Sequence, residues 1–516
     1  MQVSRTLVSR KIPAALGILL ALAVGGTAIA GPPSEPIPHW AQIVLEYALK
    51  VHDTGNSNMP PGVFPPVFGQ SFYSLDPSGL VETFNLGAPT ISNKNPFFQS
   101  IGSNGRACAT CHEARSGWGV SVASIQQRFI ASGGTDPIFR VIDGATCTTD
   151  DVSTLAARKT AYSLLLSQGL IRIFLPVPDT QLGSSPPVAR DFEITSVNDP
   201  YGCTDLSGSP AMVSAYRRPL PSANLRFLTE CSAGDPGCAP LSIMWDGREP
   251  SLASQATDAT LGHAQAANPP TGVQLTQIVN FESQIYDAQA MDFSALFLNA
   301  GGATGGPGAL SQRDFFIGIN DSLSPGFDDV VFTAYDAWAN LHGRDFVARA
   351  RASIARGETI FNTRQFTISG VNGLNEFPSD PLGVNATVGT CTTCHDSPGV
   401  GNHSEKLALD IGIADANPPA LNVSKLPVFT VQCTGGALAG QTFTVTDLGR
   451  AMISGKCADV GKMKGPILHA LASRAPYFHN GSAASLSDVV DFYDQRFSIG
   501  LTNQDKADLI AFLQAL

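Results

Sequence analysis

The chain has 516 residues, of which 43% are hydrophobic and 15% are charged. This composition excludes a disordered chain, and the length is enough to bury two or three hydrophobic cores. The net charge of −11 argues against a nucleic-acid partner, because phosphate binding requires clustered Lys and Arg.

The first 30 residues have the pattern of a secretory signal peptide. A basic start at residues 5–11 precedes an apolar run over residues 12–24 and a small-residue cleavage site at Ala28-Ile29-Ala30. A membrane anchor is the alternative, but this run is short for a spanning helix. We expect cleavage after Ala30, a periplasmic location and no membrane span in the mature protein.

Apolar periodicity predicts helices along much of the remaining chain. They are expected, in chain order, over residues 40–51, 125–130, 153–170, 348–361, 486–492 and 502–516. Residues 173–210 are broken by Pro and Gly and are expected to form a loop. In the last helix, Thr502 is a candidate cap and Asp505 lies in the first turn. We expect this helix to pack against the one over residues 348–361.

Two short stretches have the pattern C-x-x-C-H. They are Cys108-Ala-Thr-Cys111-His112 and Cys391-Thr-Thr-Cys394-His395. In this signature the two thiols bond the vinyl groups of a porphyrin and the His binds its iron. A zinc knuckle or a redox dithiol would explain a lone C-x-x-C, but here a His follows both copies, and no second C-x-x-C pairs with either copy as a zinc ribbon requires. We expect two covalently bound haem c groups, with His112 and His395 as iron ligands.

Six of the ten cysteines lie outside these motifs. An even number is compatible with three disulfides, which persist in the exported compartment where haem c is attached. The sequence alone allows about 15 pairings. Pairing nearest neighbours gives Cys147–Cys203, Cys231–Cys238 and Cys433–Cys457.

Two further blocks accompany the haem motifs: Trp245-Asp-Gly-Arg, and the stretch from Arg474-Ala-Pro-Tyr-Phe-His-Asn-Gly to Tyr493. Together these features resemble the bacterial dihaem cytochrome c peroxidase family, which includes MauG, over residues 95–516. We therefore expect a mainly α fold of two cytochrome c-like haem domains with long irregular insertions, at residues 31–345 and 346–516. The resemblance implies that peroxide reacts at the N-terminal haem and that the C-terminal haem passes electrons.

Four residues are compared with those on the reactive side of the family's N-terminal haem. Trp245 matches a Trp that relays electrons between the haems, although most Trp residues are simply packed in a core. Gln255 matches a distal-pocket Gln. Where the family has a proton-transferring Glu, this chain has Gln265, and an amide cannot shuttle protons at neutral pH. His263 is a candidate acid/base or iron ligand instead, and a hydrogen-bonded surface His is the alternative.

The position of the family's second His ligand to the N-terminal haem is Arg128 in this chain. No His occurs between His112 and His263. The resemblance therefore implies an open iron position for peroxide or dioxygen, unless His263 fills it.

Tyr493 occupies the position of the sixth ligand to the family's C-terminal haem. Ordinary peroxidases have Met there and MauG has Tyr, and a phenolate stabilises ferric iron whereas a thioether raises the potential. Core packing of the ring is the alternative, and Met452 and Met463 are competing ligands. His479, in the Phe-His-Asn-Gly block, matches a haem-propionate or inter-haem residue.

The resemblance also implies a calcium ion between the haems. Asn224 matches its side-chain ligand, and backbone carbonyls near Ser473 would complete the site. Turn formation in a Pro-rich loop is the alternative for Asn224. Arg248 and Arg450 are candidate contacts for haem propionates.

These features predict a periplasmic dihaem oxidoreductase. The leading hypothesis is reduction of hydrogen peroxide with electrons from a small cytochrome c or cupredoxin. One alternative is MauG-like or oxygenase-type oxidation of a protein or organic substrate, driven by peroxide or dioxygen. Another is a non-catalytic dihaem electron carrier. The resemblance also implies a homodimer.

Overall fold

A computed structural model describes residues 64–179, 188–236, 238–375 and 386–516. The predicted signal peptide and the helix expected over residues 40–51 lie outside this part. The described residues all belong to one unit, residues 59–516. The boundary between two haem domains after residue 345 stays a prediction. No helix among the described residues is long and apolar enough to cross a membrane.

α-Helices occur at every predicted position that the structure describes. The α-helices are α3 (Val122–Ser132), α4 (Leu155–Ala161), α5 (Ser163–Gln168), α6 (Arg226–Thr229), α7 (Leu252–Gly262), α8 (Gly272–Gln284), α9 (Pro307–Leu310), α10 (Phe346–Thr363), α11 (Ala451–Ser454), α12 (Leu486–Phe497) and α13 (Asn503–Gln514). The helix boundaries follow local signals: Thr502 caps α13 and Asp505 completes the capping box, as predicted.

Strands are more abundant than the sequence suggested. The longer ones are β2 (Ser71–Leu75), β3 (Gly79–Asn85), β5 (Ile171–Pro176), β6 (Phe192–Asn198), β7 (Met212–Arg217), β8 (Ile285–Asp292), β10 (Phe366–Ser369), β11 (Ala386–Gly389), β13 (Val428–Cys433) and β14 (Thr442–Val445). Short strands are β1 (Val67–Phe68), β4 (Thr90–Ile91), β9 (Leu296–Phe297), β12 (Ala408–Leu409) and β15 (Met463–Lys464). With 29% helix and 18% strand, the expectation of a mainly α fold is right only in part.

The expected long insertions therefore contain sheets as well as irregular segments. A four-stranded antiparallel sheet has the order β2-β3-β8-β9, a three-stranded sheet has the order β14-β13-β6, and β5 pairs with β7. The loop predicted over residues 173–210 is wrong in part, because it contains β6 and most of β5. Their partners β13 and β7 lie far along the chain, so local periodicity carries no sign of the pairing.

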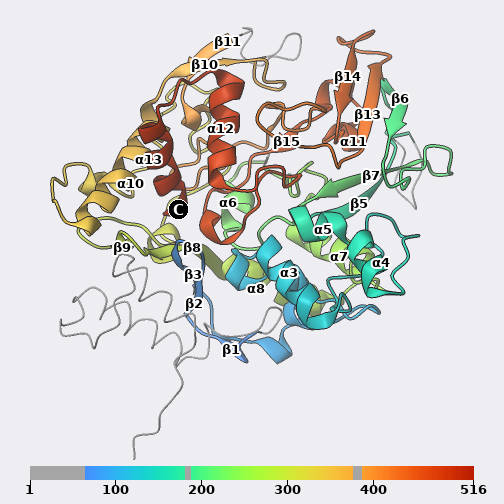
Figure 1. Cartoon of the computed structure of the whole chain (residues 1–516), viewed down its shortest axis with the longest axis horizontal. Helices are drawn as coiled ribbons and strands as arrows, with labels where there is room; N and C mark the ends of the chain where they lie inside the picture. Colours follow the sequence, from blue (N-terminus) through green and yellow to red (C-terminus); the bar gives the residue numbers. More distant parts are fainter. Residues whose placement is uncertain (1–63, 180–187, 237, 376–385) are drawn as a thin grey trace, which may run out of the picture. The chain divides into compact units, whose positions relative to one another are not determined.

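The C-terminal part is organised by α10 and α13, which pack together as predicted. Figure 1 shows them beside α12. A Cβ atom on Gly357 of α10 would lie 2.0 Å from the Asp508 carbonyl oxygen and 2.6 Å from the Phe512 Cβ atom. The two helices approach this closely only because position 357 has no side chain. The same core contains Phe361, whose ring centroid lies 5.8 Å from that of His395.

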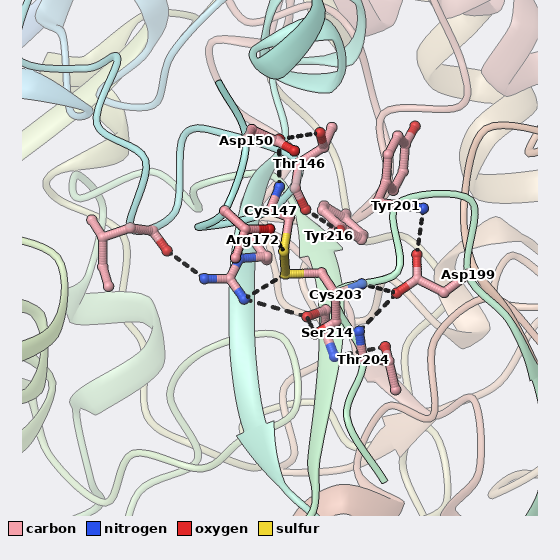
Figure 2. Close-up of a disulfide and its surroundings, with 12 residues drawn as sticks. Thr146, Cys147, Asp150, Arg172, Asp199, Tyr201, Cys203, Thr204, Ser214 and Tyr216 are labelled. Atoms are coloured by element: carbon pink, nitrogen blue, oxygen red, sulfur yellow. Dashed lines mark hydrogen bonds between the residues drawn. A yellow bond between two sulfur atoms is a disulfide. The ribbon is translucent and has the colours of Figure 1, made fainter. Parts of the chain in front are cut away.

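All three predicted disulfides are confirmed. They are Cys147–Cys203, Cys231–Cys238 and Cys433–Cys457. Figure 2 shows the first, beside the β5–β7 pair. Asp150 accepts a hydrogen bond from the Cys147 amide at 2.7 Å, and Asp199 accepts one from the Cys203 amide at 2.9 Å. A carboxylate thus fixes the backbone at each end of this covalent link.

Candidate functional site

Both C-x-x-C-H stretches fold into the same short turn. The first cysteine begins a 3-10 helix in each copy, η3 (Cys108–Thr110) and η6 (Cys391–Thr393). Its carbonyl accepts hydrogen bonds from the amides of the second cysteine and the His, at 3.1 and 3.1 Å in the first copy and 3.3 and 3.1 Å in the second. One helical turn therefore gathers two thiols and an imidazole, which is the set that holds one haem c.

Each imidazole is oriented through its Nδ1 atom. His112 Nδ1 lies 2.9 Å from the Trp118 carbonyl oxygen, and His395 Nδ1 lies 2.6 Å from the Gly401 carbonyl oxygen. A carbonyl oxygen only accepts, so Nδ1 carries the proton and Nε2 keeps the lone pair that a metal needs. Burial lowers the pKa of both rings, which favours the neutral form.

The four cysteines of these motifs are the free cysteines of the chain. Cys108 and Cys111 line one cavity with His112, here called the first cavity, and Cys391 and Cys394 line the second cavity with His395. Most of the other residues in each lining are apolar, which suits a large apolar cofactor held through two thiols and an imidazole.

The two cavities share one wall. Trp245 lies in both linings, together with residues 218–221 and 464–466. Its ring nitrogen donates to the Arg218 carbonyl at 2.8 Å, and its own carbonyl accepts from the Lys464 amide at 2.8 Å. The centroid of the Trp245 ring lies 6.1 Å from that of His479. The indole is thus held at the boundary between the two cavities.

Three cations at this wall form no salt bridge with a carboxylate among the described residues: Arg218, which is buried, and Lys464 and Arg474, which are half-buried. Arg218 and Lys464 line both cavities and Arg474 lines the second, and their side chains bond only backbone carbonyls among the described residues. Burial lowers the pKa of Arg218 to about 9, that of Arg474 to about 10 and that of Lys464 to about 8. Buried charges normally have counter-ions, and haem propionates would supply them. The residues present therefore fit two covalently bound haems.

The two arginines that were predicted to contact haem propionates, Arg248 and Arg450, are not among these three cations. Arg248 lines the first cavity but pairs with Asp246 at 2.9 Å. Arg450 lies in neither lining and donates to the Asp246 carbonyl. Sequence reasoning missed Arg218, Lys464 and Arg474, because their uncompensated charge becomes visible only once the fold shows what surrounds them.

Gln255 and His263 both line the first cavity, from α7 and from the residue directly after it. His263 Nδ1 donates to Asp143 Oδ2 at 2.5 Å, and Asp143 also pairs with Arg106. Burial alone would raise the pKa of Asp143, but Arg106 and the bond to His263 outweigh it and lower the pKa. An ionised Asp143 therefore fixes the His263 ring and leaves Nε2 as its basic nitrogen. Asp143 carried no motif that could have identified it from the sequence.

Two positions that correspond to reactive residues in the resembled family lie outside the first cavity. Gln265 is exposed and has a left-handed backbone, with φ of 54°. Arg128 is buried, pairs with Glu113 and a second carboxylate, and donates to the Thr110 carbonyl within the first haem motif. Arg128 therefore stabilises the backbone of the first haem motif. Neither Arg128 nor Gln265 is placed to act on a ligand in the cavity.

The second cavity contains two of the three candidate sixth ligands. Tyr493, on α12, and Met463, on β15, are in its lining. The Tyr493 ring centroid lies 6.4 Å from that of His395, and burial raises the pKa of its hydroxyl. Met452 is buried in a different hydrophobic core and does not line this cavity.

The residues expected to bind calcium are bonded to other parts of the chain. Asn224 Oδ1 accepts from the Asp287 amide at 2.9 Å, and its Nδ2 donates to the Asp287 carbonyl at 2.8 Å. The Arg474 carbonyl, next to Ser473, accepts from Arg218 at 2.8 Å. A guanidinium thus contacts this carbonyl. No cluster of three or more His, Cys, Asp or Glu in the described ranges suits a metal ion, but the expected ligands are an Asn and backbone carbonyls, so the calcium site stays a prediction.

Comparison with known proteins finds partial relatives. No family model matches the sequence. The chain is 34% identical over 136 residues to cytochrome-c peroxidase IdrP2 of Denitromonas iodatirespirans, which covers 25% of this chain and 36% of the relative. It is 41% identical over 81 residues to cytochrome-c peroxidase IdrP1 of Pseudomonas sp. (strain SCT), which covers 14% and 21%. The chain therefore spans about a third or less of the length of these curated relatives.

Two solved structures show a weak likeness. A MauG-like protein associated with microbial copper homeostasis has a TM-score of 0.31 and 15% identity over 61% of this chain and 79% of that one. A hydrazine synthase of Kuenenia stuttgartiensis has a TM-score of 0.27 and 15% identity over 69% and 86%. At these scores neither carries an argument. The sequence matches make the chain distantly similar, over part of its length, to bacterial dihaem cytochrome c peroxidases.

Proposed function

We propose that this protein is an exported two-haem c-type oxidoreductase that reduces hydrogen peroxide with electrons from a small redox protein. The observation that carries the proposal is the pair of cavities that share Trp245 and differ in their polar groups. Partial similarity to cytochrome-c peroxidases supports the reaction class. The three disulfides agree with a location outside the cytoplasm.

In this proposal the first cavity is where peroxide reacts. Cys108, Cys111 and His112 hold its haem, which when bound supplies the redox-active iron. Gln255 can donate a hydrogen bond to a bound peroxide. His263, fixed by Asp143, can take the proton that peroxide loses as it binds.

The second cavity would receive electrons and pass them on. Cys391, Cys394 and His395 hold its haem, and the rest of the lining is mostly apolar. Trp245 would carry electrons across the shared wall. Trp245 is buried, its indole nitrogen donates a hydrogen bond, and its backbone carbonyl accepts one. The position of the ring is therefore well fixed.

A second candidate function is MauG-like oxidation of a protein or organic substrate. The observation in its favour is Tyr493 in the second cavity. A phenolate ligand disfavours ferrous iron, which is the state that forms when a peroxidase accepts an electron from its donor. Peroxide or dioxygen would then be the oxidant.

The test is steady-state oxidation of a reduced small cytochrome c by hydrogen peroxide, followed by the absorbance of the donor. We expect two donors oxidised per peroxide and slower turnover in Trp245→Phe. Trp338→Phe is the matched control, because Trp338 is fully buried in the α10–α13 core and lies in neither lining. Failure to oxidise any donor with peroxide would contradict the proposal. Substrate oxidation without donor oxidation would favour the second candidate.

A further inference from the structure

Glu282 is a buried carboxyl group in the lining of the first cavity. It lies on α8, and 5% of its surface is exposed. Ile278, one turn earlier on the same helix face, joins Phe281 in a hydrophobic cluster with Phe97 and Ala256. This cluster fixes α8 against α7 and the first haem motif, so Glu282 stands at the cavity with little freedom to turn away.

Among the described residues, Glu282 has neither a hydrogen bond nor an ion pair. The other carboxylate in the lining, Asp143, is held by Arg106 and His263. Burial alone raises the pKa of Glu282 to about 8, which makes it a neutral acid at pH 7. The titratable or cationic side chains that share this lining are those of Arg106, Cys108, Cys111, His112, Asp143, Arg217, Arg218, Arg248, His263 and Lys464.

A buried polar group without a partner is costly, so its partner is expected to come from what occupies the cavity. A carboxylic acid offers an O–H donor in addition to its acceptor oxygen. The other carboxyl group of the lining, Asp143, is ionised and is held by Arg106 and His263. Glu282 is therefore the carboxyl group of this lining that has a proton to give.

We propose that Glu282 is a catalytic acid of the first cavity, which gives its proton to the departing oxygen of hydrogen peroxide. This inference rests on the proposed function. The O–O bond breaks, the departing oxygen leaves as water, and solvent returns a proton to the Glu282 carboxylate. The remaining oxygen becomes the second water with two electrons from the donor, the proton held by His263 and one proton from solvent.

The test is the rate at which the haem-loaded protein reacts with hydrogen peroxide, measured by stopped-flow absorbance as a function of pH. We expect Glu282→Gln to slow this reaction about 10²- to 10⁴-fold, the usual contribution of general acid catalysis. We expect Glu282→Asp to be intermediate. The wild-type rate should fall as pH rises through the pKa of the acid, and this fall should be absent in Glu282→Gln. Glu193→Gln is the control, because Glu193 is exposed on β6 and lies in neither lining.

Each outcome is decisive. A wild-type protein that does not react with peroxide contradicts the proposed function itself. If the wild type reacts and Glu282→Gln has the same rate and pH profile, only the role of Glu282 is wrong. A slower Glu282→Gln with an unchanged pH profile means that the residue is structural, which also overturns the inference. If Glu282→Gln yields no haem-loaded protein, the profile of Glu282→Asp decides: a displaced midpoint supports the role, and an unchanged one refutes it.

Discussion

Replacing Glu282 by Gln should change how the stability of the protein depends on pH. Burial raises the pKa of Glu282 from 4.5 to about 8 in the folded protein. The acid form is therefore favoured by folding, and its contribution is complete below pH 4.5 and is lost as pH rises to about 8. Each tenfold change in proton affinity is worth about 1.4 kcal/mol, so the full loss is about 5 kcal/mol. Gln does not titrate and avoids this loss.

The assay is urea unfolding of the haem-loaded wild type and the Glu282→Gln variant between about pH 5 and pH 8. We expect the stability difference to shift in favour of the variant by more than 1 kcal/mol for each pH unit. The matched exposed change, Glu193→Gln, should leave the pH dependence of the wild type unaltered. Equal slopes for wild type and Glu282→Gln would refute the argument that the buried acid is neutral.

Three other changes test separate parts of the account. Replacing Cys391 and Cys394 by Ala should leave one covalent haem per chain by intact mass, whereas breaking the Cys231–Cys238 disulfide should leave two. Gly357→Ala should cost about 1–3 kcal/mol through overpacking, partly offset by about 1 kcal/mol of helix propensity, as read from urea unfolding. Gly272→Ala, where a Cβ meets nothing within 4 Å, should cost nothing. Treatment with EGTA should alter neither the haem spectra nor the peroxide reaction, because the Asn224 amide is bonded to the Asp287 backbone. Loss of either would show that a bound calcium ion contributes to the site.

The features that sequence could predict are those encoded within a few residues. The two haem turns, the cap of α13 and the Cys231–Cys238 disulfide depend on short spacings. The other two disulfides join cysteines 24 and 56 residues apart and followed from pairing neighbours along the chain. The sheets were missed because β5 and β6 pair with strands that are distant in sequence. Whether such a segment becomes a strand depends on a partner that the local pattern does not reveal.

The candidate site shows the same division. Gln255 could be found from the family resemblance and His263 from its closeness to Gln265, and both line the first cavity. Asp143 and Glu282 could not be found from the sequence, because their importance lies in what surrounds them. Asp143 is held by Arg106 and His263, whereas Glu282 has no partner among the described residues. Charge balance in a cavity is a property of the fold rather than of a motif.

The most direct test of the central claim is electron paramagnetic resonance of the ferric, haem-loaded protein before and after one equivalent of hydrogen peroxide. The account predicts one high-spin signal, from a haem at His112 with an open position, which peroxide abolishes. It also predicts one low-spin signal from the haem at His395. Two low-spin signals that peroxide leaves unchanged would contradict the account and identify an electron carrier.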